Sequence, residues 1–138
     1  MIIACVLMCI LNMHNMDHIE FENIVTEAIE AIPGPFSERI ENVAFIIEAI
    51  PSDEQRRQLG LHCNQTLYGL YEGVPLPQRN GATKLLPDKI TIFREPILVS
   101  SSSPQEVISK VKNTVWHEVA HYFGLDHDRI HELESRVR

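Results

Sequence analysis

The sequence predicts one α+β domain, in which a small mixed sheet packs against an N-terminal helix and a long helix near the C-terminus. The chain has 138 residues, a length that suits one domain rather than two. Apolar residues recur at three- and four-residue steps near both ends, whereas the middle holds short β-branched or alternating runs. Hydrophobic residues make up 44% of the chain and charged residues 22%, which is ordinary for a soluble globular protein.

Residues 1–15 are predicted to be an apolar extension that is not part of the fold, which leaves residues 16–138 as the domain. Residues 2–11 form an apolar run that is too short to span a bilayer. No basic residue precedes this run and no small-residue cleavage site follows it, so it is a poor secretory signal. We therefore interpret the extension as dispensable and expect no membrane partner.

The first half of the domain predicts a helix followed by a buried strand. Apolar residues from Ile19 to Ile32 follow the helical period, and Pro33 with Gly34 ends the helix. The run VAFIIEAI is apolar and rich in β-branched residues, and Pro51 closes it. The expected elements are a helix over 17–32, a short helical turn at 36–41, a strand over 43–50 and a brief helix over 52–59.

The second half predicts two more strands and the long helix. Alternation over TLYGLYE and KITIFR is typical of strands, and Pro96 is expected to stop the second one. Ser103 and Glu106 match a capping box, and Pro104 suits the first helical position. The expected elements are strands over 66–72 and 89–94, a long helix from 103 to Gly124, and a short helix from about 128.

The long helix carries a pattern that predicts a metal site, H-E-x-x-H-x-x-G-x-x-H. His117 and His121 lie four residues apart, so their side chains project from nearly the same helix face, about 6 Å apart along the axis. Two imidazoles at this spacing can bind one tetrahedral zinc ion. Glu118 is turned about 100° around the helix from His117, so it can approach a zinc-bound water without binding the metal itself.

A third ligand requires the chain to turn after the helix. On a continued helix His127 would lie about 15 Å along the axis from His117, out of reach of the same ion. Gly124 stands where a left-handed C-cap ends a helix most easily, and such a turn can bring His127 back. The predicted zinc ligands are therefore His117, His121 and His127, which leaves the fourth position open for water.

This arrangement predicts a zinc-dependent peptidase, a hydrolase acting on peptides or unfolded protein segments. Zinc would lower the pKa of its bound water, and Glu118 would act as the general base while that water attacks a peptide carbonyl. The strand over 89–94 is expected to offer an edge to an extended substrate. A second donor to the oxyanion stays unassigned, and the candidates are Tyr68, Tyr71, Tyr122, Arg94 and His131.

From Asp17 onward the chain resembles the minimal zincin-like metallopeptidases of bacteria. The similarity lies in the N-terminal amphipathic helix and in three segments: TLYGLYEGVPL, LPDKITIFREPIL and VWHEVAHYFGLDHDRIHEL. The resemblance implies a compact zincin-like α+β fold, with the HExxH helix over a small sheet, and a cytoplasmic location. It implies no particular substrate.

Two departures from related patterns bear on the third ligand. The long motif is also similar to that of metzincins, but no methionine follows His127, so the chain has no Met-turn to place under the zinc. Relatives in the minimal family often carry an acidic residue near the position of His127. Asp126 and Asp128, which flank His127, therefore stay open as alternatives to it. His131, one turn further on, is another contender.

Charge and cysteine content narrow the function classes further. The formal net charge is -7 and no basic patch occurs, which argues against a nucleic-acid partner. Three cysteines form a poor disulfide framework, which favours a reducing cytoplasmic environment. The alternative to a peptidase is a catalytically inactive zinc-binding adaptor or regulatory module with the same fold. The oligomeric state is left open.

Overall fold

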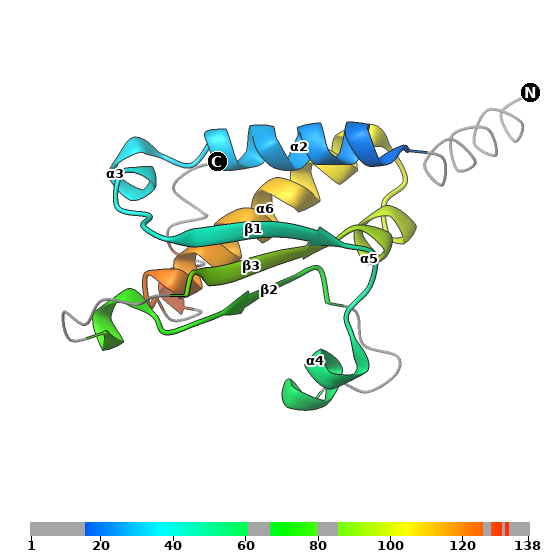
Figure 1. The fold of residues 1–138 in the computed structure, drawn as a ribbon. Coiled ribbons are helices and arrows are strands. Elements are labelled where there is room, and N and C mark those ends of the chain that lie inside the picture. Colours follow the sequence, from blue (N-terminus) through cyan, green and yellow to red (C-terminus); the bar gives the residue numbers. More distant parts are fainter. Residues whose placement is uncertain (1–15, 61–66, 80–85, 126–127, 131, 133–138) are drawn as a thin grey trace, which may run out of the picture.

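The computed structural model describes residues 16–60, 67–79, 86–125, 128–130 and 132. The order of helices and strands confirms the α+β class (Figure 1). The predicted extension over residues 1–15 lies outside the described residues. The elements are α2 (His18–Glu30), α3 (Gly34–Ser37), β1 (Val43–Glu48), α4 (Asp53–Gln58), β2 (Gly69–Glu72), the 3-10 helix η1 (Leu76–Gln78), β3 (Asp88–Phe93), α5 (Arg94–Val99) and α6 (Pro104–Tyr122).

The three strands form one mixed sheet in the order β1-β3-β2. Strand β1 runs parallel to β3, with Val43 opposite Asp88, and β2 runs antiparallel to β3, with Gly69 opposite Ile92. The predicted mixed sheet is therefore confirmed. Because β3 lies between the other two strands, the expectation that residues 89–94 offer a free edge is wrong. Among the described strands, β1 and β2 form the outer edges.

The long helix α6 packs against both the sheet and the N-terminal helix α2. It packs on β2, on β3 and on α2, and it crosses behind the strands in the view of Figure 1. Valines four residues apart place one face of α6 in the core, because side chains at this spacing share a helix face. The buried core consists of Phe21, Val25, Ala28, Ile32, Ile90, Ile92, Ile97, Leu98, Val107, Val111, Val115 and Val119.

The start of α6 differs in one detail from the predicted capping box. The Ser103 hydroxyl accepts the Glu106 N–H at 3.1 Å, as expected for an N-cap. The Glu106 carboxylate, however, accepts hydrogen bonds from the N–H and the hydroxyl of Ser102, at 2.9 and 2.7 Å. These bonds from Ser102 lower the pKa of Glu106 to about 2. The predicted box is thus half formed, with its carboxylate one residue further back.

Helix α5 was not predicted, because Pro96 reads most simply as the end of a strand. The structure starts a helix at Arg94, which makes Pro96 the third helical residue. A proline is tolerated there, since the first N–H groups of a helix have no partner within it. The predicted strand over 89–94 accordingly ends at Phe93. The short helix η1 was not predicted either.

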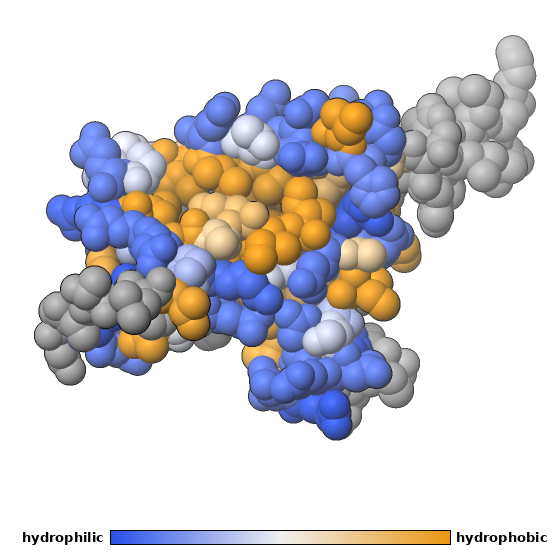
Figure 2. Space-filling view, viewed as in Figure 1, coloured by the Kyte–Doolittle hydropathy of each residue, from blue (hydrophilic) through white to orange (hydrophobic). Residues whose placement is uncertain are grey.

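On the face drawn in Figure 2, hydrophobic side chains gather in a hollow between α2 and β1, and most of the side chains around it are hydrophilic. Val25 and Ile29 of α2 and Phe45 and Ile47 of β1 line this hollow. Within the described part of the chain, no helix combines the length and the apolar character needed to cross a membrane.

Candidate metal site

Helix α6 ends in a glycine turn, as the sequence predicts. Gly124 has a φ of +74°, in the left-handed region that favours glycine. Its N–H donates to the carbonyl of His121 at 2.9 Å, and the Leu125 N–H donates to the carbonyl of Ala120 at 3.1 Å. This pair of bonds is the Schellman motif, which reverses the chain at the end of a helix. His121 therefore lies in the last turn of α6, beside the reversal.

His117, Glu118 and His121 come together at this end of α6. One ligand atom from each residue lies within 4.8 Å of those of the other two. The two imidazole rings have their centroids 4.8 Å apart and stand at 77° to each other. Both histidines are half-buried, whereas Glu118 is only 8% exposed. The described structure thus places the three residues of the HExxH motif in one small group.

Glu118 is a buried carboxyl whose charge is poorly solvated. Burial raises the pKa of Glu118 to about 7, and a hydrogen bond from the backbone N–H of Tyr71 opposes this rise. A divalent cation beside the carboxylate would also oppose it, because an opposite charge favours the ionised form. Two imidazoles at this spacing are ligands that suit zinc, and the buried Glu118 carboxylate lies beside them, where a general base would act. The residues present therefore fit this metal.

The Tyr71 N–H reaches Glu118 because of the way β2 pairs with β3. The Phe93 N–H donates to the Tyr68 carbonyl at 2.8 Å, so the backbone carbonyl of Tyr68 points toward β3. Hydrogen-bonded positions alternate along an antiparallel strand, and so the peptide groups of Gly69 and Tyr71 point away from β3. The outer edge of β2 therefore presents its backbone beside α6, at the level of the HExxH group.

Gly69 allows this close approach of strand and helix. A Cβ atom at Gly69 would lie 2.5 Å from Cγ2 of Thr114 and 3.2 Å from Cγ of Glu118. Only a residue without a side chain fits between β2 and α6 at this point. The prediction of strand 66–72 did not use this glycine, although a glycine inside a strand often marks a close backbone approach.

A pocket of about 360 Å³ adjoins the HExxH group formed by His117, Glu118 and His121. It extends along α6 from His117 back to Lys110, about 10 Å along the helix axis. The start of β2 forms its other wall. The pocket is lined by Leu67, Tyr68, Gly69, Lys110, Asn113, Thr114, His117 and Glu118.

The structure separates the predicted candidates for an oxyanion donor. The Tyr71 hydroxyl donates to Asp88 at 2.5 Å, and the buried Tyr122 hydroxyl accepts the Glu41 N–H at 3.1 Å. Tyr68 lines the pocket beside His117, but its hydroxyl donates to Ser100 at 3.0 Å. Each of these three hydroxyls therefore bonds to a residue outside the HExxH group. His131 lies outside the described residues.

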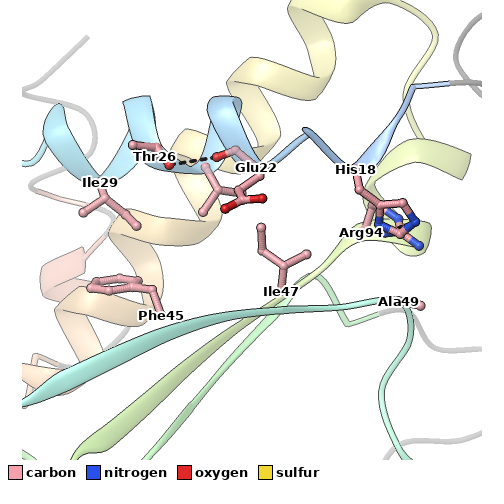
Figure 3. A pocket seen from close by; sticks show the side chains of 9 residues that line it. His18, Glu22, Thr26, Ile29, Phe45, Ile47, Ala49 and Arg94 are labelled. Carbon is pink, nitrogen blue, oxygen red and sulfur yellow. Dashed lines mark hydrogen bonds between the residues drawn. The ribbon is translucent and has the colours of Figure 1, made fainter. Parts of the chain in front are cut away.

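Arg94 belongs to a different part of the molecule. It lines the hollow between α2 and β1, where its guanidinium contacts the ring of His18 (Figure 3). In the same view Phe45 and Ile47 point from β1 toward α2. Since this hollow shares no lining residue with the pocket beside His117, the structure does not bring Arg94 into the candidate site.

The predicted third ligand is not placed by the structure. His127 and its alternatives Asp126 and His131 lie outside the described residues. Asp128 is described, and it is exposed at the start of a helical stretch over 128–130. Its assignment as a ligand is not tested by this placement, and His127 stays a prediction.

Comparison with known proteins places the chain in a family. The sequence model of the zincin-like metallopeptidase family matches residues 40–137, which is more than half of the chain. The matched range holds all three strands, α6 and the HExxH motif, whereas α2 precedes it. No curated protein matches the chain.

Proposed function

Because the chain belongs to the zincin-like metallopeptidase family, we propose that it is a zinc-dependent peptidase that hydrolyses peptide bonds. The observation that carries the proposal is the group formed by His117, Glu118 and His121 on the last turns of α6, beside the outer edge of β2. Metal-assisted peptide hydrolysis uses zinc ligands and an acid–base group, and an extended substrate can pair with a strand edge such as that of β2.

Each motif residue has one role in this proposal. His117 and His121 would hold the zinc, with His127 as the third ligand on the evidence of the sequence pattern. Bound zinc would supply a Lewis acid and lower the pKa of water toward neutrality. Glu118 takes the proton of the attacking water and passes it to the leaving amine. The hydrogen bond from the Tyr71 N–H holds this carboxylate at the strand edge.

The substrate is proposed to be an extended peptide or an unfolded protein segment. The outward peptide groups at Gly69 allow a substrate strand to pair with the edge of β2, which replaces β3 as the expected edge. A side chain of that substrate would enter the pocket between Tyr68 and Asn113. Folded proteins present few segments that can add to a strand edge in this way, because their strands are already paired.

We further propose a cytoplasmic enzyme without a nucleic-acid or membrane partner. The net charge of -7 supports the exclusion of nucleic acids. The three cysteines, an odd number, are consistent with a reducing compartment.

The test compares the wild type with Glu118→Gln after both are loaded with zinc. Gln is close in shape to Glu and keeps an oxygen that accepts the Tyr71 N–H, so the variant should fold and bind zinc. We expect stoichiometric zinc in both proteins by elemental analysis, and turnover of a mixed library of internally quenched peptides by the wild type alone. Zinc binding without turnover in the wild type would instead indicate an adaptor. Equal cleavage by both proteins would mean a contaminating protease.

A further inference from the structure

A buried charge cluster lies next to the candidate site on the side of the β2–β3 connection. The hydroxyl of Tyr71 donates to Oδ2 of Asp88 at 2.5 Å, and the guanidinium of Arg79 forms an ion pair with the same carboxylate. The Asp88 side chain is fully buried, and that of Arg79 is 13% exposed. Burial and the neighbouring carboxylate raise the pKa of Tyr71, so its hydroxyl keeps the proton that it donates.

The cluster holds the segment from Gly73 to Arg79 at both of its ends. A Cβ atom at Gly73 would lie 2.4 to 2.8 Å from the carboxylate atoms of Asp88, so the carboxylate packs directly on the backbone where the chain leaves β2. At the other end, Nε of Arg79 donates to the carbonyl of Val74 at 2.9 Å. One buried carboxylate thus contacts both ends of the turn that contains η1.

This turn packs against the end of the helix that carries the histidines. The Arg79 guanidinium lies 5.2 Å from the centre of the Tyr122 ring, and Tyr122 is the last residue of α6. A Cβ atom at Gly124 would lie 2.9 Å from Cγ of Pro77. The Gly124 N–H in turn donates a hydrogen bond to the carbonyl of His121. The cluster is therefore linked through short contacts to the turn of α6 that holds His121.

A second route leads from the cluster to Glu118. The side chain of Tyr71 bonds to Asp88, while the peptide N–H of the same residue bonds to the Glu118 carboxylate. Asp88 therefore restrains, through one residue, the strand segment that holds the general base. The two routes converge on two of the three residues of the HExxH group.

We propose that the cluster of Tyr71, Asp88 and Arg79 positions the HExxH group. It holds Glu118 through the backbone of β2, and it holds the helix turn of His121 through the Gly73–Arg79 segment. These are positioning residues, because they act through other residues. The inference rests on the proposed zinc-peptidase function. A cluster that only stabilised the fold would lower the free energy of unfolding and leave the metal geometry and the turnover of folded protein unchanged.

The experiment uses Tyr71→Phe, which removes one hydroxyl, and Arg79→Met, which removes the ion pair. Ser101→Ala is the matched control, since the Ser101 hydroxyl is also buried and donates to the Ile97 carbonyl at 2.6 Å on α5. All variants are compared at a temperature at which circular dichroism shows them folded. The readouts are zinc affinity by chelator competition, the visible spectrum of the cobalt-loaded protein, and kcat and KM for one quenched peptide that the wild type cleaves.

We expect both cluster variants to lose about tenfold in zinc affinity and in kcat, to change the cobalt spectrum and to change KM little. The control should lose stability alone. Wild-type zinc affinity, spectrum and kcat in Tyr71→Phe would overturn the positioning role, even if Arg79→Met failed to fold. A wild type that binds no zinc would overturn the proposed function and this inference together. If the wild type binds zinc and cleaves the peptide while Tyr71→Phe behaves like it, the proposed function stands and only the positioning role is overturned.

Discussion

Glu118 is placed where its charge destabilises the metal-free protein, and this cost can be measured. Burial raises its pKa from the ordinary 4.5 to about 7. Below pH 4.5 the group is protonated in both the folded and the unfolded state, so it has no effect on the free energy of unfolding. As the pH rises from 4.5 to 7, the unfolded chain loses the proton first, and the folded state is destabilised. Above pH 7 the cost is constant.

The two pKa values give the size of the effect. A difference of about 2.5 pKa units at 1.36 kcal/mol per unit corresponds to about 3 kcal/mol above pH 7. Between pH 5 and pH 8 most of this cost develops, about 2.5 kcal/mol. Glu118→Gln removes the charge and keeps an acceptor for the Tyr71 N–H. In the absence of metal the variant should therefore become more stable than the wild type as the pH rises.

The assay is urea unfolding of both chelator-treated proteins at half-unit steps from pH 5 to pH 8. The free energy of unfolding of Glu118→Gln minus that of the wild type should grow by about 2 to 3 kcal/mol over this range. Glu27→Gln controls for the loss of one negative charge, and because Glu27 is exposed on α2 it should not reproduce this gain. A difference that stays flat or falls with pH would refute the reasoning.

Three further predictions follow from single contacts. Gly69→Ala should lower the free energy of unfolding by about 1 to 3 kcal/mol, since its Cβ would meet the Thr114 methyl at 2.5 Å. Adding Thr114→Ser removes that methyl, so the double variant should recover part of this loss in urea unfolding. Ser103→Ala should cost about 1 kcal/mol through the lost N-cap, and an unchanged unfolding midpoint would contradict that role. Zinc at about 100 times its dissociation constant should raise the free energy of unfolding of the wild type by about 2.7 kcal/mol, and His121→Ala should abolish the gain.

The sequence predicts those elements whose signals are local. The helix predicted over 17–32 from its apolar period is α2, and the predicted cap at Ser103 accepts a hydrogen bond from the first turn of α6. Gly124 ends α6 as predicted because a left-handed residue is needed there. The proximity of His117, Glu118 and His121 likewise follows from helix geometry.

Features that depend on distant parts of the chain were not predictable in this way. The central position of β3 results from pairing with β1 across more than forty residues, and no local pattern specifies it. The bond from the Tyr71 N–H to Glu118 depends on which peptide groups face outward, and hence on the strand register. The helix from Arg94 was missed because a proline both ends strands and fits the first turn of helices.

Helix α6 presents valines to the core on one face and the histidines on another, and this has a consequence for how metal is acquired. The ligands on this helix are held in place by burial of Val111, Val115 and Val119, before any ion arrives. Metal binding then need not supply the free energy of folding, in contrast to small domains that are unfolded without zinc. The apoprotein is expected to be a stable receptor that can exchange its ion repeatedly, so that metal supply, and not refolding, sets how much of the protein is loaded.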